Sequence, residues 1–386
     1  MNALSLRQKG IVGIFGLTQA LAYGSTYYLP AVLADPISKS LHLPCEWFFA
    51  IFSCSLLLAA FFGPAAGNAI DRYGGRKILL LSNLFFAVGL LLLSLSVNLI
   101  GLVFAWAVLG MGMSLGLYEA AFATLAGIYG DKAQKAIMGI TLIAGFGSTI
   151  GWSTTLFLLD LLGWRGTCAT WALIHILIAL PLNFWVIPST FLPQVEKSSK
   201  SDVTAKSLWI LAGAFSITEF ISAGIATHLP RLLCDLGIGL KGAVVIAGLL
   251  GPSQVFSRWV TYGFSDRYSP ITSSRLAIIL YPIGGLCLLI LGIPTAALFV
   301  ILCGIGKGML TIARGTLPLA LYGVAGYGLR TGLLAVPVRF SQAMAPFLFG
   351  LTLDRGGASS ALFLSIGLGS IAFMIMARLV PIKRSA

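Results

Sequence analysis

Six ionisable residues stand inside long apolar stretches of the sequence. They are four cations and two acids: Arg258, Lys307, Arg314, Arg339, Glu119 and Glu219. A charged side chain that faces lipid costs about 2.5–3.5 kcal/mol or more, so each of them should face the protein interior or a water-filled cavity. The excess of cations over acids favours the binding of a negatively charged group.

Two of these cations are placed to hold a carboxylate deep in a membrane. At about 1.5 Å per residue, Arg258 lies about 9 Å from the end of an apolar segment at 242–264, and Arg339 about 12 Å inside another at 331–353. Guanidinium groups bind carboxylates and similar oxyanions through two parallel hydrogen bonds. The alternative is that both arginines only satisfy acids or backbone carbonyls.

Polar side chains with suitable spacing accompany the arginines. Gln254 precedes Arg258 by one helical turn and shares its face. In the first apolar segment, Gln19, Tyr23 and Tyr27 lie within about 80° of one another on a helix. We therefore expect amide and hydroxyl donors from the opposite half of the chain to contribute to the same anion site.

Three further charges could serve the substrate, a coupling proton or the structure. Glu219 lies in the middle of its segment, where a carboxylate can carry a proton or act as a static partner for Arg339 or Lys307. Lys307, Thr311 and Arg314 share one helix face, and Lys307 is the deeper cation. Lys307 is therefore either a second substrate-binding residue or a structural ion-pair partner.

The composition excludes most soluble classes. Of 386 residues, 58% are hydrophobic and 10% are charged, whereas soluble domains carry about 25% charged residues. The net charge of +13 does not indicate a nucleic-acid partner, because the basic residues form short clusters between apolar runs. The sequence has no phosphate-binding loop and no catalytic-triad spacing, so we predict neither an enzyme nor a cofactor. The six cysteines lack CxxC spacing and the three histidines are far apart, so we predict no metal.

Twelve apolar segments are long enough to cross a bilayer, which takes about 20 residues. They predict an all-α polytopic membrane protein with twelve transmembrane helices. The segments are 11–34, 45–67, 78–98, 99–127, 137–162, 168–188, 208–232, 242–264, 276–292, 294–321, 331–353 and 360–381.

The chain is predicted to form two pseudo-symmetric bundles of six helices each. The widest polar interruption, at 189–207, follows the sixth segment and would be a cytoplasmic linker between bundles at 1–188 and 208–386. Residues 19–35 align with 219–235, and a Gly-x-Gly at 110–112 matches another at 304–306. Repeated halves are one way in which transporters build alternating access around a central site.

The basic residues predict the orientation. With the N-terminus in the cytoplasm, sixteen Lys and Arg fall in cytoplasmic segments and five on the opposite side. Cytoplasmic loops carry an excess of Lys and Arg, so both termini are expected in the cytoplasm. We expect a monomeric multi-pass protein of the plasma membrane, which in a bacterium is the inner membrane.

The loop between the second and third segments carries a recognisable signature. Residues 67–77 read Gly-Asn-Ala-Ile-Asp-Arg-Tyr-Gly-Gly-Arg-Lys, that is, a Gly, three residues, then Asp-Arg-x-Gly with basic residues following. This loop resembles the signature loop of the major facilitator superfamily. Together with the twelve apolar segments, the resemblance covers nearly the whole chain. The resemblance implies that the loop latches one conformational state, with Asp71 near the start of the eleventh helix, where Arg330 lies, and Arg72 and Arg76 facing the cytosol. The alternative is a basic loop that only sets topology.

The resemblance also implies an inner gate formed by the cytoplasmic ends of the fourth and tenth helices. Glu119 is offset by one residue from the repeat equivalent of Arg314. We predict that these two residues pair when the protein opens outward. The alternative is a structural pair confined to one helix.

Within the superfamily, the chain resembles the monocarboxylate transporters and the oxalate/formate exchangers. Those proteins bind anions with a cationic residue on the eighth helix and, in the exchangers, another on the eleventh. Arg258 and Arg339 match these places. The chain departs from the monocarboxylate pattern because it has Gln254 where an Asp precedes the Arg, and no Lys in the first helix.

We therefore expect a secondary active transporter of a small organic anion, mono- or dicarboxylate-like, that works by alternating access in a lipid bilayer. It would be a symporter or an antiporter, with protons or a counter-anion as the coupled species. One alternative is a proton-coupled drug or metabolite efflux transporter, which would tolerate bulky neutral or cationic compounds and lose little without the arginines. A second alternative is a non-transporting membrane sensor or scaffold, which would normally need an appended cytosolic domain.

Overall fold

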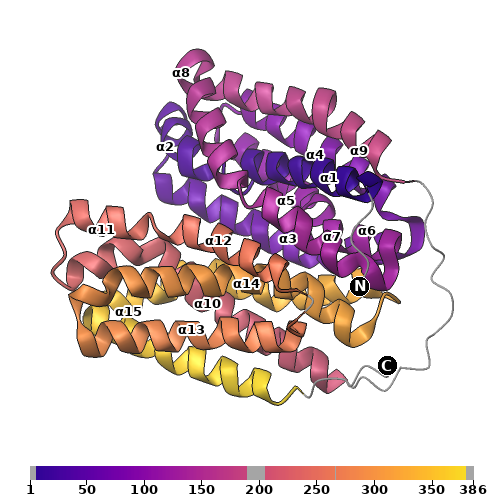
Figure 1. Ribbon diagram of the computed structural model, residues 1–386. Coiled ribbons are helices and arrows are strands. Elements are labelled where there is room, and N and C mark those ends of the chain that lie inside the picture. The colour runs from indigo at the N-terminus through magenta and orange to yellow at the C-terminus, as the bar shows by residue number, and fades with distance from the viewer. Residues whose placement is uncertain (1–5, 189–204, 266, 380–386) are drawn as a thin grey trace. The chain divides into compact units, whose positions relative to one another are not determined.

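The structure, a computed structural model, describes residues 6–188, 205–265 and 267–379. Every regular element in these ranges is a helix (Figure 1). The α-helices are α1 (Leu6–Ser25), α2 (Pro30–Ser40), α3 (Cys45–Tyr73), α4 (Gly75–Leu95), α5 (Leu99–Gly116), α6 (Tyr118–Tyr129), α7 (Ala133–Ala144), α8 (Gly147–Ile174), α9 (Leu180–Val186), α10 (Ala205–Asp235), α11 (Leu240–Ala247), α12 (Leu250–Gly263), α13 (Pro270–Leu291), α14 (Ala296–Tyr322) and α15 (Tyr327–Ala377). A π-helix, η2 (His175–Ala179), joins α8 to α9, and two short 3₁₀ turns are η1 (Gly130–Lys132) and η3 (Ile293–Thr295).

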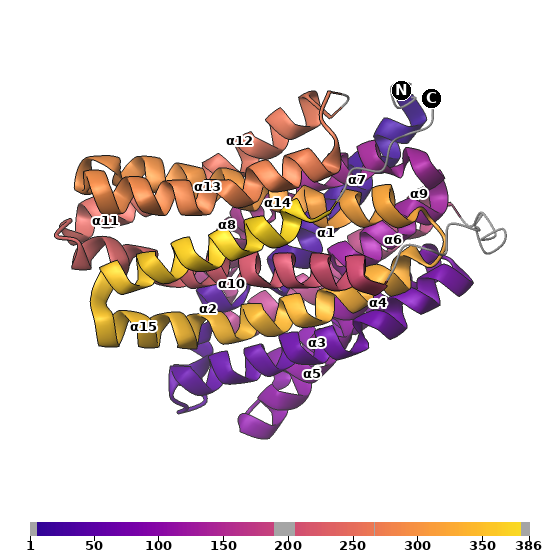
Figure 2. The ribbon, with the colours of Figure 1, turned by 90° about the horizontal axis from the view of Figure 1, so that it is seen from below.

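Nine helical stretches of the described chain are apolar and long enough to cross a membrane. Two of them, Ala133–Val186 and Tyr327–Ala377, are 54 and 51 residues long, and each is interrupted by a glycine with φ of 66°, Gly163 and Gly357. Glycine adopts such a positive φ without steric cost. Figure 2 shows α15 folding back on itself. With these two divisions and with α1 and α2, the described residues account for the twelve predicted segments and confirm the all-α polytopic class.

The first predicted helix is interrupted where the sequence suggested continuity. Residues 26–29 form a turn between α1 and α2. The prediction that Gln19, Tyr23 and Tyr27 share one helix face is therefore wrong for Tyr27, which lies in the turn. Because the residues on both sides of the turn are equally apolar, hydropathy does not reveal the interruption.

Three other predicted helices are also interrupted. The fourth is divided at Leu117, whose φ of −86° and ψ of −168° are extended. Residues 145–146 separate α7 from α8, and residues 248–249 separate α11 from α12. Each interruption leaves backbone groups without their helical partners, and these groups need other partners when they are buried.

The two Gly-x-Gly segments make equivalent contacts in the two halves of the sequence. A Cβ on Gly110 of α5 would lie 2.7 Å from the carbonyl oxygen of Ser55 in α3. A Cβ on Gly304 of α14 would lie 2.8 Å from the carbonyl oxygen of Leu250 in α12. Only glycine allows the backbones of these helix pairs to come so close, so the sequence repeat corresponds to a repeat in packing.

The described residues divide into two compact units, which fall within Met1–Ser198 plus Tyr322–Val336 and within Ser199–Leu321 plus Pro337–Ala386. The first unit therefore takes in the start of α15. The predicted bundles at 1–188 and 208–386 stay a prediction. The predicted linker at 189–207 lies almost wholly outside the described residues.

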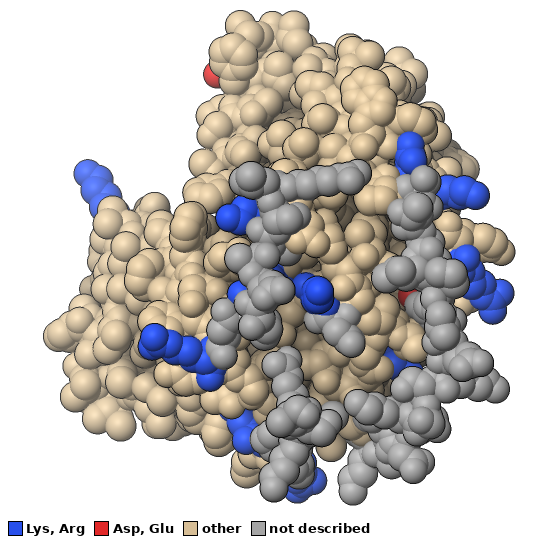
Figure 3. Space-filling view, turned by 45° about the vertical axis from the view of Figure 1, so that its right-hand side comes forward, with Lys and Arg blue, Asp and Glu red and all other residues tan. Residues whose placement is uncertain are grey.

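Large apolar side chains cover the outside of the described helices. Phe61, Trp185 and Ile290 are 75%, 77% and 74% exposed. In water such side chains would be buried, whereas lipid accepts them. On the face shown in Figure 3, uncharged atoms predominate and Lys and Arg are more frequent than Asp and Glu. The surface is that of a protein surrounded by lipid.

Candidate substrate site

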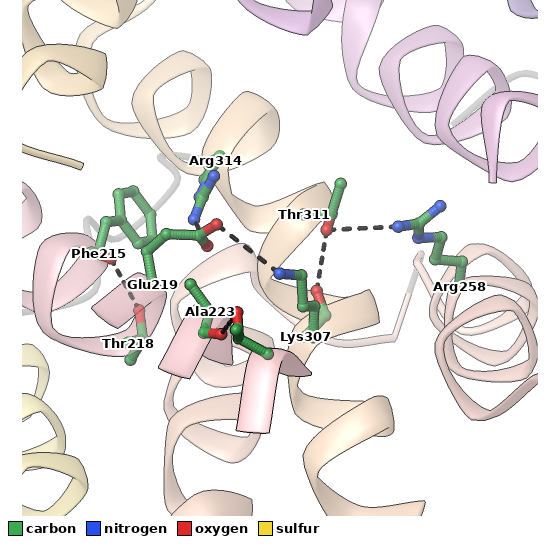
Figure 4. A network of polar contacts seen from close by, with 9 residues as sticks. Phe215, Thr218, Glu219, Ala223, Arg258, Lys307, Thr311 and Arg314 are labelled. Carbon is green, nitrogen blue, oxygen red and sulfur yellow. Dashed lines mark hydrogen bonds and ion pairs between the residues drawn. The ribbon is translucent and has the colours of Figure 1, made fainter. Parts of the chain in front are cut away.

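Glu219 on α10 lies at the centre of an ion cluster in the second unit. Its carboxylate accepts a hydrogen bond from Arg314 through Oε2, and its Oε1 lies 3.7 Å from Lys307 Nζ (Figure 4). Both cations come from one face of α14, two helical turns apart. The Glu219 side chain is 7% exposed, against 25% for Lys307 and 29% for Arg314. The structure therefore confirms Lys307 as a partner of Glu219 and adds Arg314.

Thr311 connects this cluster to Arg258 on α12. The Thr311 hydroxyl donates to the Lys307 carbonyl oxygen at 2.9 Å and accepts from Arg258 Nη2 at 3.5 Å (Figure 4). The second distance is at the upper limit for a hydrogen bond. Arg258 itself is 7% exposed. Arg258, Lys307 and Arg314 thus belong to one polar network around α14, which combines three cations with one carboxylate.

Glycines on α14 bring Arg258 to this network. A Cβ on Gly308 would overlap the Ser257 hydroxyl and the backbone of Gln254, so only glycine fits there. The close approach of α12 and α14 sets the distance from Arg258 to Thr311. Gln254 is half-buried on α12 and contributes its backbone to this contact.

Arg339 is the second predicted anion-binding arginine. It lies on α15 in the part that belongs to the second unit, and it is 9% exposed. The expectation that these deep arginines face the protein interior is confirmed for Arg339 and for Arg258. Their role in binding a substrate stays a prediction.

The predicted residues of α1 are placed in the first unit. Gln19 is 2% exposed and donates from Nε2 to the carbonyl oxygen of Gly116 at 2.8 Å. Gly116 is the last residue of α5, and its carbonyl is available because the chain is extended at Leu117. Gln19 therefore satisfies an interrupted helix end in this structure.

Tyr23 and Tyr27 belong to a cluster of half-buried tyrosines. The Tyr23 ring lies 6.1 Å from that of Tyr27 and 4.7 Å from that of Tyr118, measured between centroids. Tyr118 in turn stacks on Phe122 at 5.2 Å. Sequence reasoning missed Tyr118, because its position depends on the interruption at Leu117, which has no hydropathy signal.

The signature loop contacts the start of α15. The two carboxylate oxygens of Asp71 accept hydrogen bonds from the backbone N–H groups of Gly328 and Leu329, each at 2.9 Å. A carboxylate at a helix N-terminus satisfies free N–H groups and interacts favourably with the helix dipole. The position implied for Asp71 is confirmed, and Arg330 lies there too, donating to the Tyr322 carbonyl oxygen at 3.1 Å.

The other predicted gating residues lie on α3, α4, α6 and α14. Arg76 lies over the Phe184 ring, with its guanidinium carbon 4.2 Å from the centroid. Arg72 is in the last turn of α3, and Glu119 is in the first turn of α6. Arg314 binds Glu219 in this structure. The pair of Glu119 and Arg314 in the outward-open state stays a prediction.

The fold and the buried polar residues together define a class of protein. Apolar helices that can cross a membrane, with charges held inside them, are typical of a polytopic membrane transporter and not of an enzyme. The family model of the Major Facilitator Superfamily matches residues 15–302. The chain belongs to this superfamily.

Two curated relatives are transporters. The chain is 25% identical over 287 residues to a gallate transporter of Pseudomonas putida, covering 64% of this chain and 62% of that protein. It is 28% identical over 213 residues to monocarboxylate transporter 2 of Rattus norvegicus, covering 51% of this chain and 41% of that protein. The chain thus spans less than two thirds of the length of these relatives.

Solved structures share the fold along almost the whole chain. The human organic anion transporter MFSD10 superposes with a TM-score of 0.73 at 16% identity, covering 96% of this chain and 99% of that one. The fucose:proton symporter of Escherichia coli superposes with a TM-score of 0.74 at 12% identity, covering 96% and 97%. At this level of identity, the likeness shows the fold alone.

Proposed function

We propose that this protein is a secondary active transporter of a small organic anion of the mono- or dicarboxylate type, working by alternating access. The observation that carries the proposal is the burial of Arg258 and Arg339, which are 7% and 9% exposed. Buried cations are costly in an apolar helix bundle, so they are retained where they bind an anion. The names of the two curated relatives, a gallate and a monocarboxylate transporter, support this substrate class.

In this proposal, Arg258 and Arg339 bind the substrate carboxylate and Lys307 is a further cationic contact. The polar network supports that role for Arg258, because the Thr311 hydroxyl on α14 lies 3.5 Å from its guanidinium group. We further propose that Gln254, the α1 residues Gln19 and Tyr23, and Tyr27 in the turn at 26–29 bind the remainder of the substrate.

Glu219 has the position of a counter-ion in the proposed cycle. It neutralises two cations at once, through its contacts with Lys307 and Arg314. A proton bound at Glu219 would release both cations, so protonation and anion binding would be coupled through the same cluster. Transport that keeps its pH dependence in Glu219→Gln would remove this coupling role, and a counter-anion would then be the coupled species.

We also propose the location and orientation of the protein. It would span a plasma membrane, the inner membrane in a bacterium, as two bundles of six helices with both termini in the cytoplasm. The excess of Lys and Arg in the segments assigned to the cytoplasm supports this orientation. Labelling of single cysteines introduced near Lys135 and near Lys241 with a membrane-impermeant reagent tests it, since these positions should lie on opposite sides.

The substrate class is tested by thermal shifts of the purified full chain. The compounds are gallate, lactate, succinate, oxalate, inorganic phosphate and a quaternary ammonium drug, and any compound that stabilises the protein is then measured for flux in liposomes. We expect a carboxylate to stabilise the protein and to be transported. Stabilisation by the cationic drug alone would favour the efflux transporter instead.

The arginine variants link the substrate to the site. Arg258→Ala and Arg339→Ala should each weaken carboxylate binding about 10- to 100-fold, since a charge-assisted hydrogen bond contributes about 1.5–3 kcal/mol. Arg231→Ala is a matched control, because Arg231 is an exposed cation that pairs with Asp354 at 2.6 Å. Transport at the wild-type level by both buried-arginine variants would overturn the proposal.

A further inference from the structure

A buried polar chain joins three helices at the end of α1. His175, the first residue of the π-helix η2, is fully buried, with its Nε2 2.7 Å from Ser25 Oγ and its Nδ1 3.0 Å from Asn83 Oδ1. Ser25 is the last residue of α1 and Asn83 lies in the middle of α4. All three side chains belong to the first unit and are 3% exposed or less.

The direction of each hydrogen bond follows from the backbone. Asn83 Nδ2 lies 2.7 Å from the Leu79 carbonyl oxygen. A carbonyl only accepts, so the nitrogen of the amide must face Leu79 and its oxygen must face His175. An oxygen in that place accepts a hydrogen bond, so the proton of the imidazole is on Nδ1. Both hydrogen-bond partners of His175 are uncharged, and full burial favours the neutral ring.

The neutral ring with its proton on Nδ1 has an acceptor at Nε2. The hydroxyl of Ser25 is within reach of three acceptors, His175 Nε2 at 2.7 Å and the carbonyl oxygens of Leu21 at 2.8 Å and Ala22 at 3.3 Å. Serine in a helix ordinarily donates to a carbonyl one turn back. If Ser25 donated to a carbonyl here, His175 Nε2 would accept no hydrogen bond, and a buried acceptor without a donor is costly. Ser25 therefore donates to His175.

This bond is made where the first predicted helix is interrupted. The turn at 26–29 begins directly after Ser25, and the Tyr28 N–H donates to the Tyr23 carbonyl oxygen at 2.9 Å instead of continuing the helix. Tyr23 and Tyr27 flank Ser25 within two residues. A π-helix such as η2 is a rare element that is frequent at functional sites.

We infer that His175 is a positioning residue, which holds the end of α1 against α4 through the Ser25–His175–Asn83 chain and thereby sets the orientation of Tyr23 and Tyr27. The consequence of this role of His175 for transport rests on the proposed function, whereas the effect of His175 on the turn at 26–29 does not. His175 acts as a neutral ring that accepts from Ser25 and donates to Asn83.

Two variants separate this role from simple filling of the core. His175→Phe keeps an aromatic ring but removes both hydrogen bonds, whereas His175→Gln offers one acceptor and one donor and cannot become a cation at any working pH. Amide hydrogen exchange of the full chain in lipid nanodiscs reports on residues 21–32. We expect exchange there to be about tenfold faster in His175→Phe and close to wild type in His175→Gln.

The chain offers a matched control. Thr18 Oγ1 on α1 donates to Asn183 Oδ1 on α9 at 3.0 Å, and this bond is also buried. Thr18 lies two helical turns before the interruption, and α9 follows η2 in the chain. Thr18→Val should leave exchange at 26–29 unchanged. Equal acceleration in Thr18→Val and His175→Phe would overturn the inference, because the exchange would then report a general loosening of α1. Exchange in His175→Gln as fast as in His175→Phe would also overturn it, because a neutral side chain with one donor and one acceptor would then not replace the imidazole.

A spectroscopic measurement reads the tautomer of His175 in the wild-type protein. Nitrogen-15 NMR of histidine-labelled protein in lipid vesicles, with His175 assigned by its absence in His175→Gln, distinguishes the two neutral tautomers from the cation. We expect a neutral ring protonated on Nδ1, and a proton on Nε2 would refute the inference.

A binding measurement tests the consequence for transport. The affinity for gallate should fall more in His175→Phe than in Thr18→Val. If gallate and the other carboxylates fail to bind even the wild type, the proposed function fails while the exchange and NMR results still decide the role of His175.

Discussion

Removing one charge from the Glu219 cluster should cost more stability than removing all three. Glu219→Gln preserves the size of the side chain but leaves Lys307 and Arg314 facing an amide. Two unit charges 3.7 Å apart interact by about 4.5 kcal/mol at an effective dielectric constant of about 20, and breaking one partner of a buried pair costs about 3–5 kcal/mol. Because the cation side chains are 25% and 29% exposed, water offsets part of the loss. We expect the lower value, about 3 kcal/mol.

The triple variant Glu219→Gln, Lys307→Met, Arg314→Met removes the cluster altogether. No charge is then left buried without its partner, so we expect a loss of about 1 kcal/mol or less, or even a gain. The free energy of unfolding of the purified chain in mixed detergent micelles is measured for both variants at neutral pH.

The exposed ion pair of Arg231 and Asp354 is the control for this comparison. Their side chains are 48% and 58% exposed, and Arg231 lies on α10, as Glu219 does. A surface pair contributes about 0–1 kcal/mol, so Arg231→Gln should change stability little. A Glu219→Gln variant no less stable than Arg231→Gln, or a triple variant less stable than Glu219→Gln, would refute this account of the cluster.

Three further predictions concern the helix contacts. Asp71→Asn keeps one of the two acceptor oxygens at the start of α15 but replaces the other with an amide nitrogen and loses the charge, so we expect about 1–2 kcal/mol less stability at low salt and a smaller difference at high salt. Gly308→Ala places a methyl group against the backbone of Gln254 and should cost about 1–3 kcal/mol, whereas Gly367→Ala, with nothing within 4 Å of its Cβ, should cost nothing measurable in the same thermal unfolding assay. Gly163→Ala, at a φ of 66° and a ψ of 176° that essentially only glycine adopts, should cost about 1–3 kcal/mol by backbone strain alone, and an unchanged unfolding midpoint would contradict that.

Hydropathy and turn residues predicted the order of the helices well. The predicted gaps at 163–167 and 354–359 contain Gly163 and Gly357, the glycines at which the two longest helices are interrupted. The predicted boundary between the segments 78–98 and 99–127 falls at Asn98, whose side chain caps α5 by accepting from the Gly101 N–H at 2.9 Å. These helix ends could be predicted because each depends on one residue. Gly163 and Gly357 adopt the positive φ that interrupts the helix, and Asn98 supplies the side chain that caps the next one.

The interruptions within helices and the ion-pair partners could not be predicted in the same way. Leu117 is a good helix former, and it is extended because tertiary contacts such as that of Gln19 with Gly116 compensate the interruption. The partner of Arg314 depends on which face of α10 meets α14, and periodicity does not define that in helices that are apolar on all sides. The sequence therefore identified Glu219, Lys307 and Arg314 as charges inside apolar helices but not their arrangement.

The glycine contacts that recur in the two halves bear on how such a chain can evolve. At Gly110 and at Gly304 a Cβ would meet a main-chain carbonyl oxygen, which every amino acid possesses, and at Gly304 it would also meet the Cβ of Ser253. Mutation of the opposing residue leaves that oxygen in place, so the stacking of the helices constrains few side chains. The residues that line the polar interior of each half can then change while the helix packing is kept. After gene duplication, a copy can therefore come to transport a different solute on the same scaffold.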